Sequence, residues 1–427
     1  MDKYDYLIVG SGAGGATLAR ELTRRGKRPL VVEAGKIETS IGTYRDSTRY
    51  FDAHGVDIVK LPKMSREGTV LWRTFMAGGS TVVSCGNGVR CLEKELSALG
   101  INLETELSEA ENELHVAPIA ERLLSDGSRE IMRASRELGY TMEMMPKFIN
   151  PKACRKCGNC ALGCSHGAKW TALDYLKEAG AGGAQIMYNT RCLSAIVENG
   201  RVKGIEASGP KGKIKIMADT VIIAAGGLGT PVVLLKSGIK KAGTGLFMDL
   251  LVNTYGVTDG LNQVHEPTMT LVNHDFYRSR GFILSPFVNH TFFVRFVEIG
   301  VKVLTARDDK IIGIMTKICD EPVGQVYPDG TVSKPVTEKD KEKLNEGSRI
   351  SKEILVKAGA RKTYVSRVQG AHPGGTAAIG RVVDSNLQTE VNNLFVCDSS
   401  VLPTAPGLPP ILTIVALAKR LAKFLAA

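Results

Sequence analysis

Four cysteines gathered in one short segment are the residues best suited to chemistry in this chain: Cys154, Cys157, Cys160 and Cys164. Their spacing, C-x2-C-x2-C-x3-C, is the one with which bacterial ferredoxins hold iron–sulfur clusters on thiolates. A structural zinc ion usually takes two separated pairs of ligands, so zinc and a metal-free loop are the less favoured alternatives. Ser165 stands where the ferredoxin run has proline, and no second run occurs. We therefore expect these four thiols to hold a single [4Fe-4S] cluster, a carrier of single electrons.

Three glycines near the start of the chain, Gly10, Gly12 and Gly15, have the spacing of a dinucleotide-binding turn. The first permits a tight turn, the second lets the backbone approach a pyrophosphate, and the third lets a helix pack closely on a strand. The pyrophosphate then lies on the free N–H groups at the positive end of the helix. Glu33, at the end of the next strand, can accept hydrogen bonds from a ribose. These residues predict a nucleotide cofactor, without separating FAD from NAD.

The elements that must position these residues are buried strands followed closely by helices. Residues 6–9 and 30–32 are apolar runs typical of parallel strands, with a helix between them. A second strand, turn and helix run from 221 to 238, where Thr230 is expected as the N-cap and Pro231 as the first helical residue.

The middle of the chain has the alternating pattern of an antiparallel sheet. Residues 193–207 alternate around Asn199-Gly200, which is typical of a β-hairpin. A capping box at Thr337 and Asp340 predicts the start of a long helix. The other expected elements are strands at 301–304, 311–315 and 394–397, the end of the long helix at Gly359, and a closing helix from about 411.

Composition is that of an ordinary globular protein, with 427 residues and a net charge of +11 that is scattered along the chain. No aromatic-interleaved basic stretch occurs, so nucleic-acid binding is not expected, whereas an acidic redox partner or anionic substrate fits the charge. The longest apolar run, 411–418, is too short to span a bilayer, and no signal peptide is predicted, so a cytoplasmic location is expected.

The other cysteines are expected as small buried side chains: Cys85, Cys91, Cys192, Cys319 and Cys397.

Further motifs follow one another through the chain in a fixed order. They are Ala77-Gly78-Gly79-Ser80-Thr81, then Ala225-Gly226-Gly227-Leu228-Gly229-Thr230-Pro231, then His372-Pro373-Gly374-Gly375-Thr376, and finally Asp398, Pro403 and Pro409 within 396–413. Together with the opening glycines, these segments resemble the glucose–methanol–choline (GMC) family of FAD oxidoreductases. The resemblance reaches both ends of the chain and its middle.

The resemblance implies FAD as the cofactor. It also implies that Gly78 and Gly79, with Ser80, lie against the flavin, that Asp398 meets the ribityl chain or pyrophosphate, and that Pro409 belongs to the same site. His372 would be the catalytic base that takes the proton of a substrate hydroxyl. This chemistry suits an imidazole, which titrates near neutral pH.

The chain departs from the family where many members carry an Asn or second His beside the substrate oxygen, because Pro409 has no side-chain donor or acceptor. The group that replaces it is sought among polar residues of the substrate region: Tyr255, His265, His274, Asp275, Tyr277 and His290.

The fold class expected from these features is α/β. A Rossmann-like FAD-binding domain is built from the discontinuous segments 1–145, 185–246 and 366–427. An iron–sulfur insert follows at 146–184, and an α+β substrate domain with an antiparallel sheet at 247–365.

The expected function is a dehydrogenase that oxidises an alcohol by hydride transfer to FAD and passes electrons through the [4Fe-4S] cluster to an external carrier, or the reverse reduction of a carbonyl. Two alternatives are an FAD and iron–sulfur electron-transfer module without a substrate, and a nicotinamide-dependent enzyme with structural zinc. The residues fix neither the reaction direction nor the oligomeric state.

Overall fold

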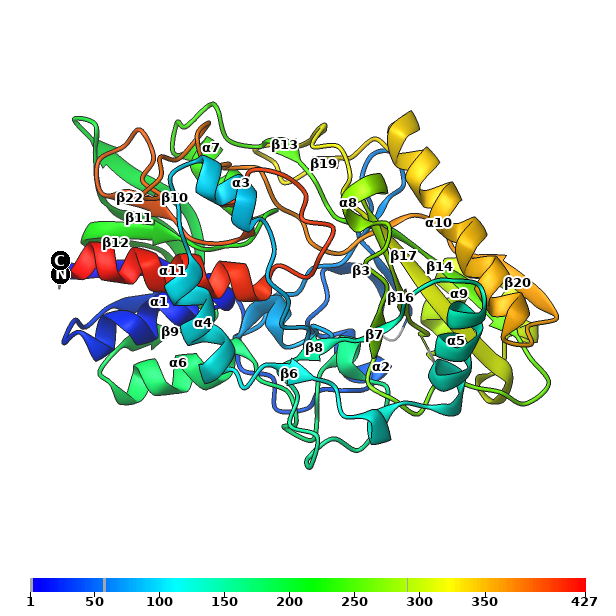
Figure 1. Ribbon diagram of the computed structural model, residues 1–427. Helices are drawn as coiled ribbons and strands as arrows, with labels where there is room; N and C mark the ends of the chain where they lie inside the picture. Colours follow the sequence, from blue (N-terminus) through cyan, green and yellow to red (C-terminus); the bar gives the residue numbers. More distant parts are fainter. Residues whose placement is uncertain (1–2, 57–58, 290) are drawn as a thin grey trace.

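A seven-stranded sheet forms the half of the molecule that holds both chain ends (Figure 1). The computed structural model describes residues 3–56, 59–289 and 291–427. The strand order is β10-β11-β12-β1-β2-β9, with β22 also paired to β12. The strands are β1 (Lys3–Val9), β2 (Leu30–Val32), β9 (Gln185–Met187), β10 (Arg191–Glu198), β11 (Arg201–Gly209), β12 (Gly212–Ile223) and β22 (Leu394–Val396). Strands β9, β2, β1, β12 and β22 run parallel, whereas β10 and β11 form an antiparallel extension.

Helices cover this sheet because their apolar faces need burial. They include α1 (Ala13–Arg24), α4 (Glu104–Glu113), α6 (Ala172–Ala181) and α11 (Ile411–Ala426). Helix α1 packs against both α6 and α11, and α4 packs on α11. The apolar residues of β1 and α1 are almost completely buried in this core.

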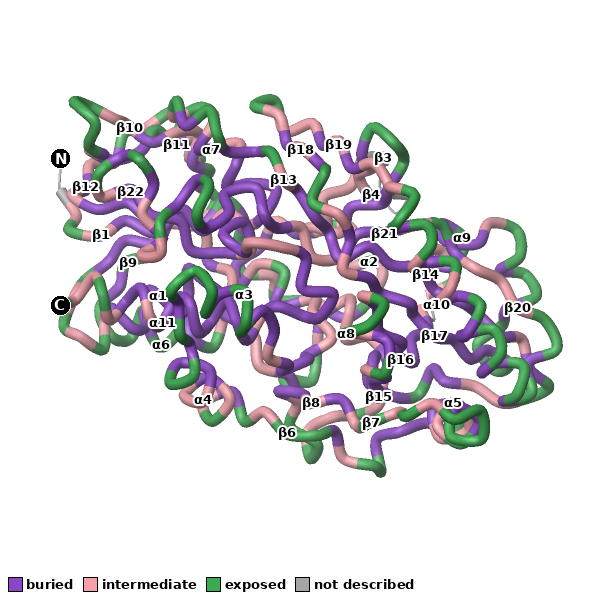
Figure 2. The backbone as a smooth tube through the Cα atoms, turned by 45° about the horizontal axis from the view of Figure 1, so that its top comes forward, coloured by how far each residue is buried: buried purple, intermediate pink, exposed green. Residues whose placement is uncertain are grey.

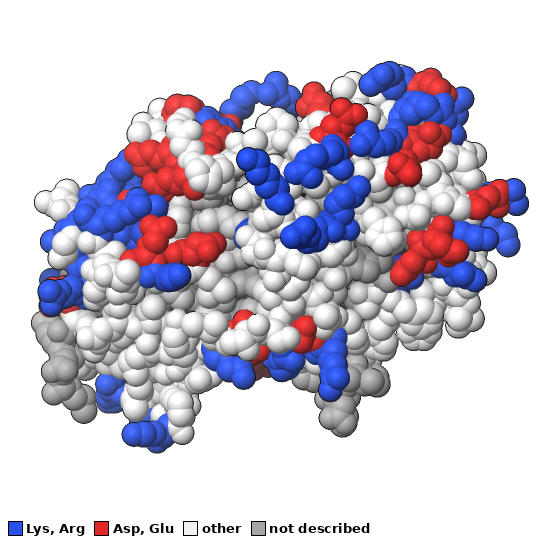
Figure 3. All heavy atoms as spheres, turned by 90° about the horizontal axis from the view of Figure 1, so that it is seen from below, with Lys and Arg blue, Asp and Glu red and all other residues white. Residues whose placement is uncertain are grey.

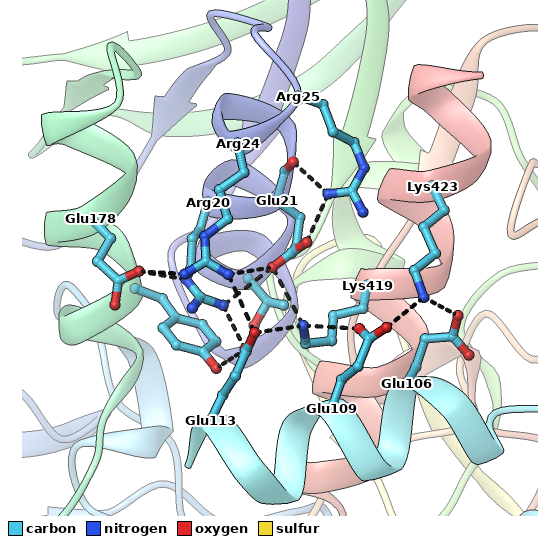
Figure 4. Close-up of polar contacts among 12 residues, drawn as sticks. Arg20, Glu21, Arg24, Arg25, Glu106, Glu109, Glu113, Glu178, Lys419 and Lys423 are labelled. Atoms are coloured by element: carbon cyan, nitrogen blue, oxygen red, sulfur yellow. Dashed lines mark hydrogen bonds and ion pairs between the residues drawn. The ribbon is translucent and has the colours of Figure 1, made fainter.

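A charged network joins the four helices at one end of this half (Figure 4). The buried Arg20 of α1 donates to Glu113 of α4 (2.7 Å) and Glu178 of α6 (2.6 Å). The buried Lys419 of α11 donates to Glu113 (3.1 Å) and Glu21 (3.4 Å). Because charges this deep need partners, the network fixes how the helices pack.

The second half is built on a six-stranded sheet with the order β16-β17-β14-β21-β5, in which β20 also pairs with β14. Its strands are β5 (Val70–Leu71), β14 (Leu250–Val257), β16 (Phe282–Pro286), β17 (Ile311–Ile318), β20 (Lys362–Val365) and β21 (Gln369–Gly370). All pairings are antiparallel except β21 with β5. Helices α10 (Glu338–Lys357) and α5 (Asp126–Glu137) pack together, and α10 lies along the sheet (Figure 1). A second hydrophobic core fills the space between α10 and these strands.

Short elements complete the fold. They are α2 (Tyr44–Ser47), β3 (Ala53–Val56), β4 (Val59–Pro62), α3 (Glu93–Ala98), β6 (Ala117–Pro118), β7 (Glu143–Met144), β8 (Pro146–Lys147), α7 (Thr230–Lys236), β13 (Thr244–Leu246), β15 (Leu271–Val272), α8 (Tyr277–Arg280), α9 (Phe292–Ile299), β18 (Gly324–Val326) and β19 (Val332–Ser333). The 3-10 turns are η1 (Gly79–Thr81), η2 (Glu121–Leu123), η3 (Cys160–Leu162), η4 (Gly300–Thr305), η5 (Asp308–Lys310) and η6 (Ser399–Val401). Within the described ranges, no helix is long and apolar enough to cross a membrane.

Two local expectations from the sequence were wrong. The strand expected at 301–304 is the 3-10 turn η4, directly after α9, and Val301 and Leu304 are 73% and 69% exposed. Gly300, with φ of 63°, turns the chain there onto the surface, where the segment pairs with no strand in the described sheets. The N-cap of α7 is Gly229, because the Thr230 hydroxyl donates instead to Asp398.

The buried backbone runs continuously through both halves, and exposure is concentrated in turns and outer helices such as α3 and α8 (Figure 2). Two segments expected in the nucleotide-binding part belong to the second half: residues 70–71 form a strand of its sheet, and residues 126–137 pack on its helix α10. Basic and acidic side chains are interspersed on the face seen from below (Figure 3).

Candidate active site

A cavity of about 830 Å³ is lined by residues from both sheets. The first sheet contributes the loop after β1, the end of β2 and the loops after β12 and β22. The second contributes side chains of β14, β17 and β21, and the segment around Pro409 closes the lining. The cavity therefore accommodates a large ligand that reaches from one half to the other.

The glycines after β1 have the geometry that a phosphate turn requires. Gly10 has a φ of +99°, and a Cβ there would lie 2.2 Å from the carbonyl oxygen of Ala224. A Cβ on Gly15 would lie 2.0 Å from the oxygen of Gly10, which shows how closely α1 packs on the turn. A Cβ on Gly12 would meet nothing within 4 Å. Gly12 borders the cavity, so this open space is available to a ligand at the N-terminus of α1.

Two buried carboxylates border the same cavity. Glu33 accepts from the Ser11 amide (2.9 Å) and hydroxyl (2.6 Å) and from the Gly35 amide (2.7 Å). Asp398 accepts from the amides of Gly226 and Ser400, both at 2.8 Å. Burial raises the pKa of Asp398, and these donors oppose that shift. Both carboxylates are thus held rigidly at the cavity wall.

The second glycine loop approaches the first. Gly79 and Ser80 line the cavity, and a Cβ on Gly79 would lie 3.1 Å from the Cα of Gly12. Gly78 is not a lining residue; it adopts a left-handed turn with φ of 82°, and its amide donates to the Ser11 hydroxyl (3.1 Å).

His372 faces the cavity and is held by a buried carboxylate. Its Nδ1 lies 2.9 Å from Oδ2 of Asp249, whose other oxygen accepts from the Gly407 amide (2.8 Å). Asp249 has a φ of 47°, an uncommon conformation that aims its side chain at the imidazole. Burial raises the pKa of Asp249 to about 7, while burial and the nearby Lys317 lower the pKa of His372 well below its usual value. The imidazole is therefore neutral near pH 7.

Neither Asp249 nor Lys317 was identified from the sequence. Both lie in apolar surroundings without a motif, so only the polarity of two side chains in otherwise buried segments could have pointed to them.

Pro409 is buried at the cavity wall. The described members of the polar set expected to replace its missing partner do not line the cavity. The Tyr255 hydroxyl donates to Glu298, and the Tyr277 hydroxyl donates to the Pro406 carbonyl. His265 is exposed, His274 borders another hollow, and Asp275 accepts from the Thr141 amide. His290 lies outside the described residues. The polar side chains found on the second sheet's wall are instead Asn253, Lys317 and Gln369.

Cys154, Cys157, Cys160 and Cys164 line one small hollow. Burial raises the pKa of Cys154 and Cys157, and the charges of the neighbouring thiolates add to that shift. Among the described residues, no group of three or more His, Cys, Asp or Glu side chains is arranged to hold a metal ion. The four thiols thus surround a common space without converging on one point.

The hollow adjoins the large cavity. Ala161 and Leu162, between the third and fourth cysteines, line the large cavity. The buried Lys169 donates to the carbonyl of Cys160 (3.0 Å) and to those of Val82 (2.9 Å) and Ser84. One ammonium group therefore ties the cysteine loop to the segment that follows Gly79 and Ser80.

The remaining cysteines differ in burial. Cys91, Cys192 and Cys397 are buried as expected, whereas Cys85 and Cys319 are only partly buried, and Cys85 lines the large cavity.

Comparison with known proteins reveals a family. Residues 4–251 and 315–418 match the two models described as GMC oxidoreductase. An uncharacterized protein of Methanocaldococcus jannaschii is 32% identical over 98% of both chains. A long-chain-alcohol oxidase of Arabidopsis thaliana is 25% identical and is aligned with 97% of this chain and 67% of its own length.

Solved structures share the fold. Pyridoxine 4-oxidase from Mesorbium loti superposes with a TM-score of 0.77 at 17% identity, covering 99% of each chain. An Aspergillus oryzae formate oxidase superposes with a TM-score of 0.74 at 15% identity, covering 99% of this chain and 98% of its own.

Proposed function

Because the chain belongs to the GMC oxidoreductase family, we propose that it binds FAD in the large cavity and oxidises an alcohol, or reduces a carbonyl in the reverse direction. The observation that carries this proposal is the His372–Asp249 pair, which faces a cavity whose other wall is the glycine turn. Bound FAD would supply a two-electron acceptor for hydride. An electron-transfer module without a substrate would not need an accessible imidazole beside such a cavity.

The residues at the cavity wall fit FAD. The Gly10–Gly15 turn and the N-terminus of α1 suit a pyrophosphate, because the space beside Gly12 is open. Glu33, already fixed by Ser11 and Gly35, retains acceptor capacity for ribose hydroxyls. Gly79, Ser80 and Asp398 line the path toward His372. Gly78 does not line the cavity, but its left-handed turn and its hydrogen bond to the Ser11 hydroxyl hold this loop in place.

His372 would act as the base. In its ionised form, which a pKa of about 7 allows above neutral pH, Asp249 accepts a hydrogen bond from Nδ1–H. The lone pair of Nε2 is then left to take the proton of the substrate hydroxyl as hydride leaves the carbon. In the reverse direction, the same nitrogen returns the proton to the carbonyl oxygen. The imidazole suits this task because it is neutral near pH 7.

We further propose that Cys154, Cys157, Cys160 and Cys164 hold a [4Fe-4S] cluster, which would supply one-electron transfer to an external carrier. The common hollow of the thiols and its contact with the large cavity through Ala161 and Leu162 support this proposal. The enzyme would then be a dehydrogenase, although the named relatives include an oxidase. The cytoplasmic location expected from the sequence stays a prediction.

The first experiment is anaerobic purification followed by flavin, iron and sulfide analysis. We expect one FAD per chain and cluster iron that is lost in Cys160→Ser with flavin retained. Cys192→Ser, which changes a buried cysteine outside the hollow, should keep the iron. A colourless protein that contains zinc would overturn both cofactor assignments.

The second experiment follows reduction of the bound flavin by a panel of alcohols without oxygen. His372→Ala should slow reduction by about a hundredfold or more, whereas His265→Ala, at an exposed histidine, should not. If the flavin of His372→Ala were reduced at the wild-type rate, His372 would not be the catalytic base. Reoxidation by oxygen as fast as by a one-electron dye would favour an oxidase.

A further inference from the structure

Lys317 has so far entered only through its effect on the pKa of His372, without a contact of its own to the substrate. It lies in β17, is 1% exposed, and its Nζ has no hydrogen-bond partner. Its side chain lines the large cavity, as does that of Met315 two residues earlier on the same strand. An ammonium group buried without a partner is costly, so its retention beside a ligand cavity points to a partner that arrives with the ligand.

The sheet register places Lys317 beside the catalytic pair. Lys317 is paired with Leu251 of β14, and Asp249 directly precedes that strand. On the other side of β14, Gly370 is paired with Leu250, and His372 follows two residues later. The positive charge of Lys317 lowers the pKa of His372 and opposes the burial that raises the pKa of Asp249. The three side chains therefore meet at the same end of the second sheet.

The side-chain amides near Lys317 already donate hydrogen bonds within the protein. The side chains of Asn253, Asn289 and Gln369 also line the cavity, but each donates to the buried Glu298, at 2.9, 2.9 and 2.7 Å. Pro409 has no donor. Among the described polar side chains on this wall, Lys317 is thus the one whose nitrogen donates no hydrogen bond to the protein.

We propose that Lys317 forms an oxyanion site, in which its ammonium donates to the oxygen on the reacting carbon of the substrate. This assignment rests on the proposed function and supplies the group that Pro409 lacks. The substrate hydroxyl gives its proton to Nε2 of His372, and the C–O bond becomes a carbonyl as the carbon gives up a hydride, for which bound FAD would be the acceptor. Burial lowers the pKa of Lys317, and the nearby Asp249 opposes that shift. In its ammonium form Lys317 keeps its protons throughout and stabilises the negative charge that develops on oxygen. In the reverse direction it polarises the carbonyl.

The test compares wild type with Lys317→Met and uses acetate as a probe for a small oxyanion. Acetate binding is measured by calorimetry on the purified protein, so the measurement does not depend on turnover. We expect Lys317→Met to bind acetate roughly tenfold to hundredfold more weakly, because the substitution removes one charge-assisted hydrogen bond. Lys63→Met is the control, because Lys63 lines the same cavity but donates to the Gly330 carbonyl (3.4 Å).

Thermal stability and kinetics separate this role from a structural one. Lys317 makes no hydrogen bond that the substitution would break, and Asp249 can take up a proton when the positive charge is removed, because burial already raises its pKa to about 7. The melting temperature of Lys317→Met should therefore change little near neutral pH, while kcat for an uncharged alcohol falls with little change in KM. Lys317→Ala should regain activity when methylamine is added. If Lys317→Met folds poorly, acetate affinity and kcat are compared between wild type and the milder variant Lys317→Gln.

Three results would overturn the proposal: unchanged acetate affinity, unchanged kcat, or a loss confined to the KM of alcohols that carry a carboxylate. A protein that binds acetate through Lys317 but binds no flavin would overturn the proposed function and leave the oxyanion site in place.

Discussion

At the scale of single residues, the site depends on which nitrogen of His372 carries the proton. The substitution Asp249→Asn tests this, because asparagine tolerates the left-handed conformation at φ of 47° and so preserves the backbone. Its amide would donate to Nδ1 and force the proton onto Nε2, which removes the base. We expect flavin reduction by an alcohol to slow about a hundredfold or more, with FAD affinity and melting temperature nearly unchanged. Wild-type rates in this variant would show that Asp249 does not orient the imidazole.

The acid limb of the pH profile is a second prediction at this scale. Burial and Lys317 lower the pKa of His372 well below 6.5, and the base acts only when unprotonated. The imidazole itself should therefore stay unprotonated as pH falls through 6.5, so a loss of rate near pH 7 reports protonation of Asp249, whose pKa burial raises to about 7. A second loss should follow below the lowered pKa of His372. Lys317→Met removes one cause of the shift, so its acid limb should move to higher pH. Stopped-flow flavin reduction across pH measures both steps, and a wild-type profile with no step below 6.5 would contradict the lowered pKa of His372.

His372 could be predicted because a short motif surrounds it. Asp249 and Lys317 could not, because they lie 123 and 55 residues from it and gain their roles only through strand pairing. The left-handed backbone of Asp249 also has no signature in the sequence.

At the scale of elements, the strand–turn–helix unit makes a matched pair of predictions. A Cβ on Gly15 would lie 2.0 Å from a backbone oxygen, so Gly15→Ala should destabilise the fold by about 1–3 kcal/mol or more. A Cβ on Gly12 meets no protein atom within 4 Å but enters the space offered to a pyrophosphate. Gly12→Ala should therefore leave the free energy of unfolding of the FAD-free protein within about 1 kcal/mol of wild type and weaken FAD binding. Urea titration and FAD titration separate the two effects, and equal losses of stability would refute the distinction.

Local chemistry explains which elements the sequence could predict. The hairpin of β10 and β11 turns at Asn199-Gly200, and α10 begins with the expected capping box at Thr337 and Asp340. The strand expected at 301–304 was wrong because alternation alone does not supply a neighbouring strand. The N-cap role predicted for Thr230 was wrong because its hydroxyl donates to Asp398, 168 residues away, and a capping rule considers only neighbouring residues.

At the scale of the whole molecule, the cavity exists because distant segments assemble two sheets. Strand β5 joins the second sheet through β21, although the two lie almost three hundred residues apart. The family resemblance predicted a discontinuous nucleotide-binding domain, but it could not predict this pairing or the contact between the cysteine hollow and the cavity. Such contacts depend on the packing of complete elements.

The charged network of Figure 4 gives a prediction for global stability. Despite its burial, Glu113 has a pKa lowered to about 2 by hydrogen bonds from Arg20 and Tyr175 and by Lys419. A carboxyl whose folded pKa lies below its unfolded value stabilises the protein above the unfolded pKa, and that contribution is lost as pH falls toward the folded one. Glu113→Gln should therefore cost about 2–3 kcal/mol at neutral pH, and the difference from wild type should shrink as pH falls from about 5 toward 3.

The matched control for this network is Glu130→Gln, which removes one partner of the exposed Arg133 on α5. A surface pair of this kind contributes about 0–1 kcal/mol, so the control should change stability little at any pH. Urea unfolding of the three proteins at several pH values makes the comparison. A Glu113 variant whose deficit does not vary with pH would show that its carboxylate acts through packing and not through charge. In that case the four helices would be held by their apolar faces alone, and Arg20 and Lys419 would be neutralised by the remaining carboxylates Glu21, Glu109 and Glu178.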